Sequence, residues 1–142
     1  MIKSVAGIIY LKNKYLFQVR DKKPSIWFSG FYGFFGGLVD KGETPNQAIK
    51  REILEELNVS ITKSELLINL NFQTKKLKEK RDRYYYILNL KKNFEKKLII
   101  SEGAGFKFFS IDQIKLSNMI PWDITAIYYH QLLIKKKEFR PK

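Results

Sequence analysis

Residues 37–59 read GLVDKGETPNQAIKREILEELNV, and they contain a helix whose two ends are marked by residue type. Thr44 is a candidate N-cap, Pro45 suits the first helical position, and Gln47 stands where a capping box needs Glu or Gln. Asn58 suits the left-handed conformation that ends many helices. The stretch therefore predicts a helix that begins at Pro45 and ends just before Asn58.

Acidic side chains gather on one side of this helix. At about 100° per residue, Glu52, Glu55 and Glu56 fall on an arc roughly 100° wide, beside an apolar stripe. Crowded carboxylates repel one another, and a divalent cation such as Mg²⁺ or Mn²⁺ turns that repulsion into attraction. Arg51, four residues before Glu55, can hold one carboxylate by a charge-assisted bond. The alternative to a metal site is that these glutamates simply form a solvent-exposed face of the helix.

The spacing of the whole stretch resembles the Nudix box. Gly37 is followed by five residues and Glu43, then by seven residues and Arg51, with the remaining acids in the box order. Every defined position matches except the second glycine, where this chain has Asn58, a residue that tolerates φ > 0. The flanks resemble the family as well: the aromatic approach from Trp27 to Gly36, and Glu102-Gly103 downstream.

This resemblance implies an α/β/α sandwich with a mixed sheet, classed as α+β. It also implies cleavage of a nucleoside diphosphate linked to another moiety, with Mg²⁺ or Mn²⁺. The residues at the family's metal-binding positions are Glu52, Glu55, Glu56, Glu102 and the carbonyl of Gly36. The resemblance implies a catalytic set of Glu52, Glu102 and Arg51. Arg51 and Glu43 match positions that orient the box. The general base stays open between Glu52 and Glu102.

The rest of the chain alternates between strand and loop patterns. Strands are predicted over residues 5–11, 15–20, 66–74, 84–90, 98–100 and 106–110, with a short strand that ends at residues 36–37. Ser110 and Gln113 form a second capping box that opens a short turn. A last helix is predicted over 121–136, with Ile124, Ile127, Tyr128, Gln131 and Ile134 as its stripe. We expect one Nudix hydrolase domain over residues 1–142.

Six residues are expected to bind substrate: Arg20, Trp27, Phe28, Gly37, Tyr84 and Tyr86. Trp27 and Phe28 are candidates for stacking on a base, against the alternative of loop or core packing. Arg20 is a candidate phosphate partner, against a structural salt bridge. The tyrosines alternate on a strand, so they line either a cleft or the core. His130, the one histidine, is expected to be structural.

Composition limits the chemistry. The 142 residues contain 27 Lys plus Arg against 14 Asp plus Glu, a formal charge of +13, which favours polyanionic partners. With no cysteine and one histidine, disulfides, thiolate metal sites, cysteine nucleophiles and multi-histidine zinc sites are excluded. No apolar run approaches the roughly 18–20 residues of a membrane span, and the start is better explained by a strand than by a signal peptide. We expect no membrane partner and a cytoplasmic location.

The leading interpretation is a magnesium- or manganese-dependent Nudix pyrophosphohydrolase in which water attacks phosphorus. Its substrate is a small phosphorylated nucleotide, either a nucleoside triphosphate (oxidised ones included) or a nucleotide sugar. One alternative is a pyrophosphohydrolase of RNA 5′ ends, for which the basic surface would help, and the other is a non-catalytic nucleotide- or RNA-binding module. Three crowded acids argue against the module. Because dimers are frequent in this family, a homodimer stays open.

Overall fold

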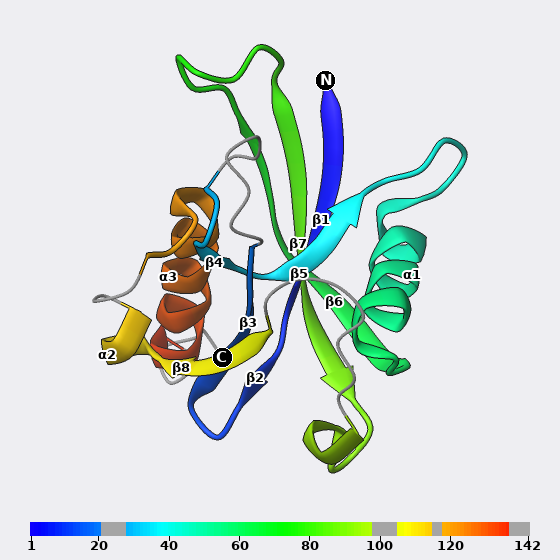
Figure 1. Cartoon of the computed structure of the whole chain (residues 1–142), viewed down its shortest axis with the longest axis vertical. Helices are drawn as coiled ribbons and strands as arrows, with labels where there is room; N and C mark the ends of the chain where they lie inside the picture. The colour runs from blue at the N-terminus through cyan, green and yellow to red at the C-terminus, as the bar shows by residue number, and fades with distance from the viewer. Residues whose placement is uncertain (21–27, 98–104, 115–117, 137–142) are drawn as a thin grey trace.

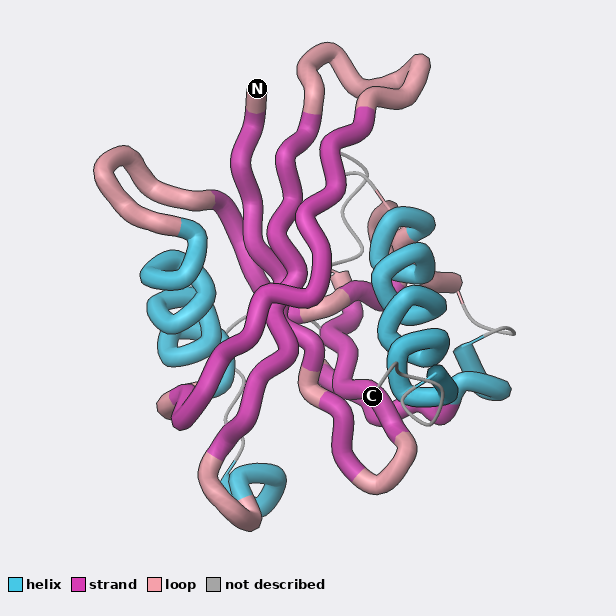
Figure 2. Tube along the Cα trace, turned by 180° about the vertical axis from the view of Figure 1, so that it is seen from behind, coloured by secondary structure: helices cyan, strands magenta, loops and turns pink. Residues whose placement is uncertain are grey.

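Two long helices flank the strands of this protein. The computed structural model describes residues 1–20, 28–97, 105–114 and 118–136. Figure 1 places α1 (Pro45–Leu57) on one side of the strands and α3 (Pro121–Lys136) on the other, and Figure 2 shows the same layers from behind. This arrangement confirms the predicted α/β/α sandwich.

The larger sheet is mixed, as predicted. Its strand order is β5-β1-β7-β6, in which β1 pairs with β7 in parallel and the other two pairs are antiparallel. The strands are β5 (Phe35–Leu38), β1 (Ile2–Ile8), β7 (Arg81–Leu90) and β6 (Ile61–Phe72). The second sheet joins β2 (Tyr10–Leu11), β3 (Lys14–Val19), β4 (Tyr32–Gly33) and β8 (Phe106–Ser110). The short helices are η1 (Phe94–Lys97) and α2 (Ile111–Ile114).

Both ends of α1 have the predicted caps. Gln47 N donates to Thr44 Oγ1 at 3.1 Å and Thr44 N donates to Gln47 Oε1 at 2.9 Å, which completes the capping box. Asn58 has φ 56° and ψ 37°, and its N–H donates to the carbonyl of Leu54 at 2.9 Å. The helix therefore begins and ends where its sequence predicts.

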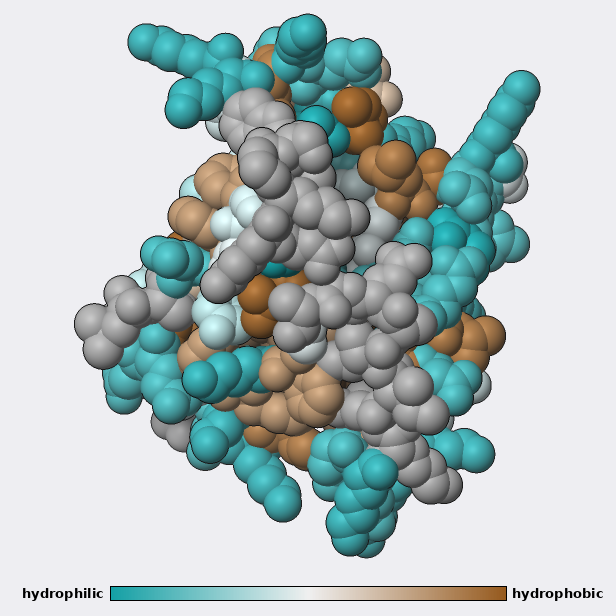
Figure 3. Space-filling view, viewed as in Figure 1, coloured by the Kyte–Doolittle hydropathy of each residue, from teal (hydrophilic) through white to brown (hydrophobic). Residues whose placement is uncertain are grey.

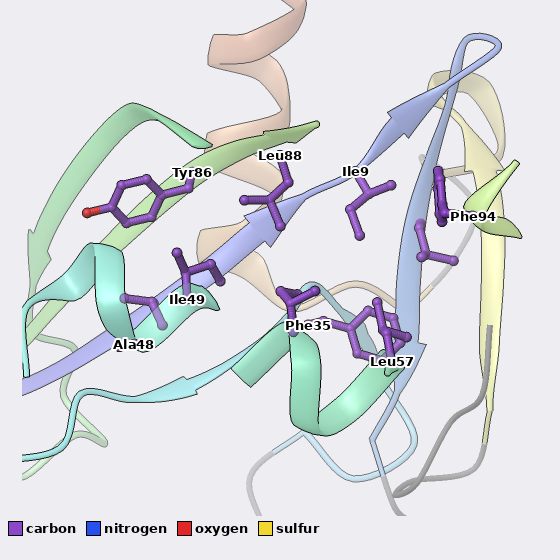
Figure 4. Packing of buried hydrophobic residues seen from close by; sticks show 11 residues of the cluster. Ile9, Phe35, Ala48, Ile49, Leu57, Tyr86, Leu88 and Phe94 are labelled. Carbon is purple, nitrogen blue, oxygen red and sulfur yellow. The ribbon is translucent and has the colours of Figure 1, made fainter. Parts of the chain in front are cut away.

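Strand β1 supplies side chains to two separate cores because successive residues of a strand point to opposite faces. Val5 packs under α1 in a cluster with Ile49 and Leu57, whereas Ala6 packs on the α3 side with Ile127. Figure 4 shows how Ile49 and Leu57 of α1 lie against residues of the sheet.

Several strand boundaries differ from the predictions. The first predicted strand, 5–11, is divided between β1 and β2, which belong to different sheets. Strand β6 begins at Ile61 rather than residue 66, because the polar residues at its start lie on an outer strand and show no apolar alternation. Strand β7 likewise begins three residues early, at Arg81. The strand over 106–110 is confirmed, and the one over 98–100 lies outside the described residues.

Helix α3 has the predicted length, and the predicted stripe is right at Ile127 and Ile124 but wrong at Tyr128 and Ile134. Its buried residues are Asp123, Ala126, Ile127 and His130, whereas Tyr128 and Ile134 are 44% and 43% exposed. Two of the four buried residues are polar and find partners inside the protein, so hydropathy alone does not mark this face.

The surface is largely hydrophilic. Figure 3 shows hydrophilic side chains around the edge of one face and apolar side chains toward its middle. Among the described residues, no helix is long and apolar enough to cross a membrane.

Candidate active site

The guanidinium of Arg51, in the middle of α1, bonds acids of the helix and of the loop before it. Arg51 Nε donates to Glu43 Oε2 at 2.7 Å and Nη2 donates to Glu43 Oε1 at 2.9 Å, a two-point bond between the helix and the preceding loop. Nη1 donates to Glu52 Oε1 at 2.9 Å and to Glu55 Oε2 at 3.3 Å. Nη2 also donates to the carbonyl of Leu38 at 3.1 Å. The predicted contact with Glu55 is present, and Arg51 ties the end of β5 to the helix.

The pairing changes the ionisation of Glu43. The hydrogen bonds from Arg51 and from the N–H of Asp40 lower the pKa of Glu43 to about 2. The same bonds raise the pKa of Arg51 above its usual value. Both groups therefore stay charged at any physiological pH, as an orienting pair requires.

Two other glutamates press against the glycines of β5. The N–H of Gly36 donates to Glu56 Oε1 at 3.0 Å. A Cβ on Gly37 would lie 2.4 Å from Glu52 Oε1, so only glycine lets this carboxylate come so close to the strand. Burial raises the pKa of Glu52, an effect that Arg51 opposes. Helix α1 thus directs two carboxylates at the backbone of residues 36–37, while Glu55 is 58% exposed.

These side chains have the donor chemistry of a site for a hard divalent cation. All donors are carboxylate or carbonyl oxygens, which are the ligands that Mg²⁺ and Mn²⁺ prefer. Among the described residues, however, no three acidic, histidine or cysteine side chains form a ready-made cage. Glu102, which the sequence adds to this set, lies outside the described residues. The chemistry of these acids fits a divalent metal, and Arg51 offsets part of their negative charge.

A cavity of about 480 Å³ opens on the other side of β5. Within the described residues, its lining contains three arginines and no acid. The lining includes Arg20, Arg81, Arg83, Phe28, Phe72, Trp122, Gly36 and Gly37. Because Gly36 and Gly37 have no side chains, only the backbone of β5 separates the cavity from the glutamates of α1.

Aromatic rings form one wall of this cavity. Phe72, at the end of β6, and Trp122, in the first turn of α3, have ring centroids 4.9 Å apart. Phe28 meets Trp122 edge to face at 5.3 Å. Rings in this arrangement offer the flat apolar surface on which a nucleobase stacks.

Arg83, which lines the cavity, belongs to a buried ion pair. Arg83 Nε lies 3.3 Å from Asp123 Oδ1, and the side chain of Asp123 is fully buried. Tyr85 OH donates to the same oxygen at 2.7 Å, and the N–H of Phe34 donates to Oδ2 at 3.0 Å. Burial raises the pKa of Tyr85 beyond its usual value, so Tyr85 acts as a neutral donor. The pair joins β7 to the start of α3.

The structure brings together some of the predicted substrate residues and separates others. Arg20, Phe28 and Gly37 line the cavity, together with Gly36. Tyr86 is buried in the cluster under α1, and Tyr84 packs against that cluster on the same face of the sheet, so neither lines the cavity. Trp27 lies outside the described residues.

Sequence analysis missed much of the cavity. The sequence did not single out four of its lining residues, nor Asp123, which pairs with one of them; the four are Phe72, Arg81, Arg83 and Trp122. The sequence nevertheless carried a signal for Arg83, which directly precedes three tyrosines of a strand. A charged side chain that such a strand buries needs a buried partner.

His130 has the structural role that the sequence predicts. Its Nδ1 lies 2.6 Å from Tyr15 OH, to which Gln131 Nε2 donates at 2.8 Å. Burial lowers the pKa of His130, so the ring stays neutral. This cluster connects α3 to β3 and does not line the cavity.

The comparisons with known proteins agree with this geometry. The family model described as NUDIX domain matches residues 1–129. The oxidized purine nucleoside triphosphate hydrolase of Danio rerio is 31% identical over 111 residues, which cover 78% of this chain and 67% of the relative. The 8-oxo-dGTP diphosphatase of Buchnera aphidicola is 29% identical over 115 residues, covering 80% and 81%.

Solved structures show the same fold. The MutT NUDIX hydrolase from Burkholderia pseudomallei superposes with a TM-score of 0.77 at 20% identity, over 90% of this chain and 96% of the other. The E. coli ORF135 protein gives a TM-score of 0.76 at 23% identity, over 94% and 90%. With the box, the sandwich and the matched length in agreement, this chain belongs to the NUDIX family of pyrophosphohydrolases.

Proposed function

We propose that this protein is a divalent-metal-dependent hydrolase of purine nucleoside triphosphates, with oxidised purines as the preferred class. The observation that carries the proposal is the cavity beside β5, which combines three arginines, an aromatic wall and a glycine floor backed by glutamates. The names of the Danio rerio and Buchnera aphidicola relatives support the substrate class.

Charge and ring contacts divide the cavity into two functions. Arginine side chains attract and orient phosphates through directed, charge-assisted hydrogen bonds. Arg20 suits this function, because its Nε is buried and has no hydrogen-bond partner within the described residues. Phe72 and Trp122 suit the base, since their rings are held by packing and lose little freedom on stacking. A triphosphate then extends from the aromatic wall toward Gly36 and Gly37.

Glu52, Glu55, Glu56 and the carbonyl of Gly36 are the proposed metal ligands, and members of this family generally use divalent metals. Such an ion, when bound, supplies positive charge that stabilises the transition state of attack on phosphorus. Arg51 and Glu43 orient the carboxylates from behind, as their two-point bond indicates.

The proposed reaction is hydrolysis without a covalent enzyme intermediate. The oxygen of water forms a bond to phosphorus, the bridging P–O bond breaks, and pyrophosphate leaves a nucleoside monophosphate. The water proton passes to a carboxylate, for which Glu52 and Glu102 are the candidates. Glu52→Gln and Glu102→Gln separate them, because removing the base flattens the rise of kcat with pH, whereas removing only a ligand raises the metal concentration needed for activity.

A substrate panel tests the function. Purified protein is incubated with 8-oxo-dGTP, dGTP, dATP, a nucleotide sugar and a 5′-triphosphorylated RNA, each with Mg²⁺ and with EDTA, and the products are separated by chromatography. We expect monophosphate and pyrophosphate from the triphosphates, with the highest kcat/KM for 8-oxo-dGTP and none in EDTA. A higher kcat/KM for the nucleotide sugar or the RNA would overturn the proposed substrate class.

A further inference from the structure

The polar lining of the cavity points to how the base is chosen. We propose that Arg83 selects purines with a 6-oxo group by donating a hydrogen bond to it, and that Asp123 positions Arg83 for this contact. This inference rests on the proposed function, because it places a purine nucleotide in the cavity.

Arg83 is held in one orientation by three neighbours. Its Nε lies 3.1 Å from Tyr85 OH and 3.3 Å from Asp123 Oδ1, and its Nη1 donates to Ser4 Oγ at 3.2 Å. The guanidinium also lies over the ring of Tyr85, 5.3 Å from its centroid. A planar group fixed at two nitrogens has no rotation left, so the direction of its third nitrogen is set by the protein.

That third nitrogen, Nη2, is available to a ligand. Within the described residues no hydrogen bond engages Nη2, and the fully buried side-chain atom there that lacks a partner is Arg20 Nε rather than Nη2. Nη2 is therefore not sealed off by protein atoms, and Arg83 is one of the residues that line the cavity. The side chain of Arg83 is 14% exposed, so it is not closed to a bound molecule.

The position of Arg83 suits the base rather than the phosphates. Its partner Asp123 follows Trp122 directly, so the turn that supplies the aromatic wall also holds the guanidinium. On the sheet, Arg83 pairs with Leu70, two residues before Phe72, whose ring is the other half of that wall. A purine stacked on these rings brings its edge to Nη2.

Charge distinguishes Arg83 from the other two arginines. Arg83 is neutralised by Asp123 at 3.3 Å, whereas neither Arg20 nor Arg81 forms an ion pair within the described residues. A neutralised guanidinium attracts phosphate weakly but keeps its directed N–H groups. Because guanidinium donates and never accepts, it favours the oxygen of a 6-oxopurine and disfavours the amino group of adenine.

Asp123 does not read the base itself. Its Oδ1 receives Tyr85 OH and Arg83 Nε, its Oδ2 receives the N–H of Phe34, and its side chain is fully buried. These bonds make Asp123 a positioning residue that acts through Arg83.

The experiment compares dITP with dATP, two substrates that differ at purine position 6 and in the N1 proton that accompanies the 6-oxo group. We expect the wild-type kcat/KM to favour dITP by about tenfold to a hundredfold, the range of one hydrogen bond to a charged group. Arg83→Met should reduce this ratio to about twofold or less, mainly because kcat/KM for dITP falls. Arg81→Met removes one positive charge from the same cavity and is the matched control. It should lower kcat/KM for both substrates by the same factor and leave their ratio unchanged.

Asp123→Asn should also reduce the dITP/dATP ratio in folded protein, an effect that a purely structural role would not produce. A wild-type ratio near one, or equal losses on both substrates in Arg83→Met, would overturn the inference. If Arg83→Met fails to fold, the Arg83→Met/Asp123→Asn double variant, which buries no unpaired charge, takes its place. If no triphosphate is hydrolysed, the proposed function fails, and calorimetric binding of dIMP against dAMP still decides whether Arg83 selects the base.

Discussion

Arg51 and Arg83 are both held by carboxylates, on opposite sides of the larger sheet, yet they sit in opposite electrostatic situations. Arg51 faces three glutamates within 3.3 Å, so its surroundings carry excess negative charge. Arg83 faces a single carboxylate, Asp123, and the pair is neutral. An acid-rich cluster can bind a cation, whereas a neutral buried pair provides only hydrogen-bond donors in fixed positions.

The largest expected effect comes from the acid-rich side. Glu56→Gln keeps the size of the side chain but removes the charge that faces Gly36, and we expect kcat to fall by about 100-fold or more with the melting temperature nearly unchanged. Glu65→Gln, an exposed glutamate on β6, is the matched control and should leave kcat unaltered. Near wild-type turnover by folded Glu56→Gln protein in Mg²⁺ would contradict the proposed ligand set.

Gly37→Ala tests how closely the acids must approach the strand. The added methyl would lie 2.4 Å from Glu52 Oε1, so the carboxylate has to move. A displacement of about 1 Å at a reacting centre lowers kcat by up to about 100-fold, and we expect a loss approaching that size. Steady-state kinetics with 8-oxo-dGTP measure the loss of kcat, and a circular dichroism melt checks that the variant is folded. An unchanged kcat would show that turnover does not depend on the exact position of the Glu52 carboxylate.

On the neutral side, the expected loss is in stability. Asp123→Asn leaves Arg83 charged and buried without its partner, and breaking a buried pair in this way costs about 3–5 kcal/mol. Urea unfolding measures the difference, with the exposed Asp112→Asn as a control expected to shift the free energy of unfolding by less than about 0.5 kcal/mol. A cost for Asp123→Asn no larger than that of the control would remove the contrast between the two networks.

The smallest effect concerns His130, which lies on the same side as Arg83. Burial lowers its pKa in the folded state, so below the unfolded value of about 6.5 the unfolded chain binds the proton more readily. Stability therefore falls as pH falls through that range, by at most about 1.4 kcal/mol per pH unit because one group titrates. Denaturant unfolding between pH 7.5 and about 5 should show this slope in the wild type and lose it in His130→Gln.

The two networks also differ in how far the sequence predicted them. The Arg51 cluster lies within one helix and the loop before it, so residue spacing was enough to bring Arg51, Glu43 and the glutamates together. The surroundings of Arg83 come from β1, β7 and the start of α3, and along the chain Arg83 is 79 residues from Ser4 and 40 residues from Asp123. No local pattern predicts such contacts, and for this reason the stripe predicted for α3 omitted its buried polar residues, Asp123 and His130.

The sequence by itself determined the family, the extent and caps of α1, and the set of crowded glutamates, because these depend on interactions within a few residues along the chain. Only the tertiary structure decided that Gly36 and Gly37 separate the acids from a cavity, and that Asp123 holds Arg83 rather than facing solvent. The physical reason is burial: the sheet brings distant polar groups into a low-dielectric interior, where each must find a partner that spacing along the chain does not reveal.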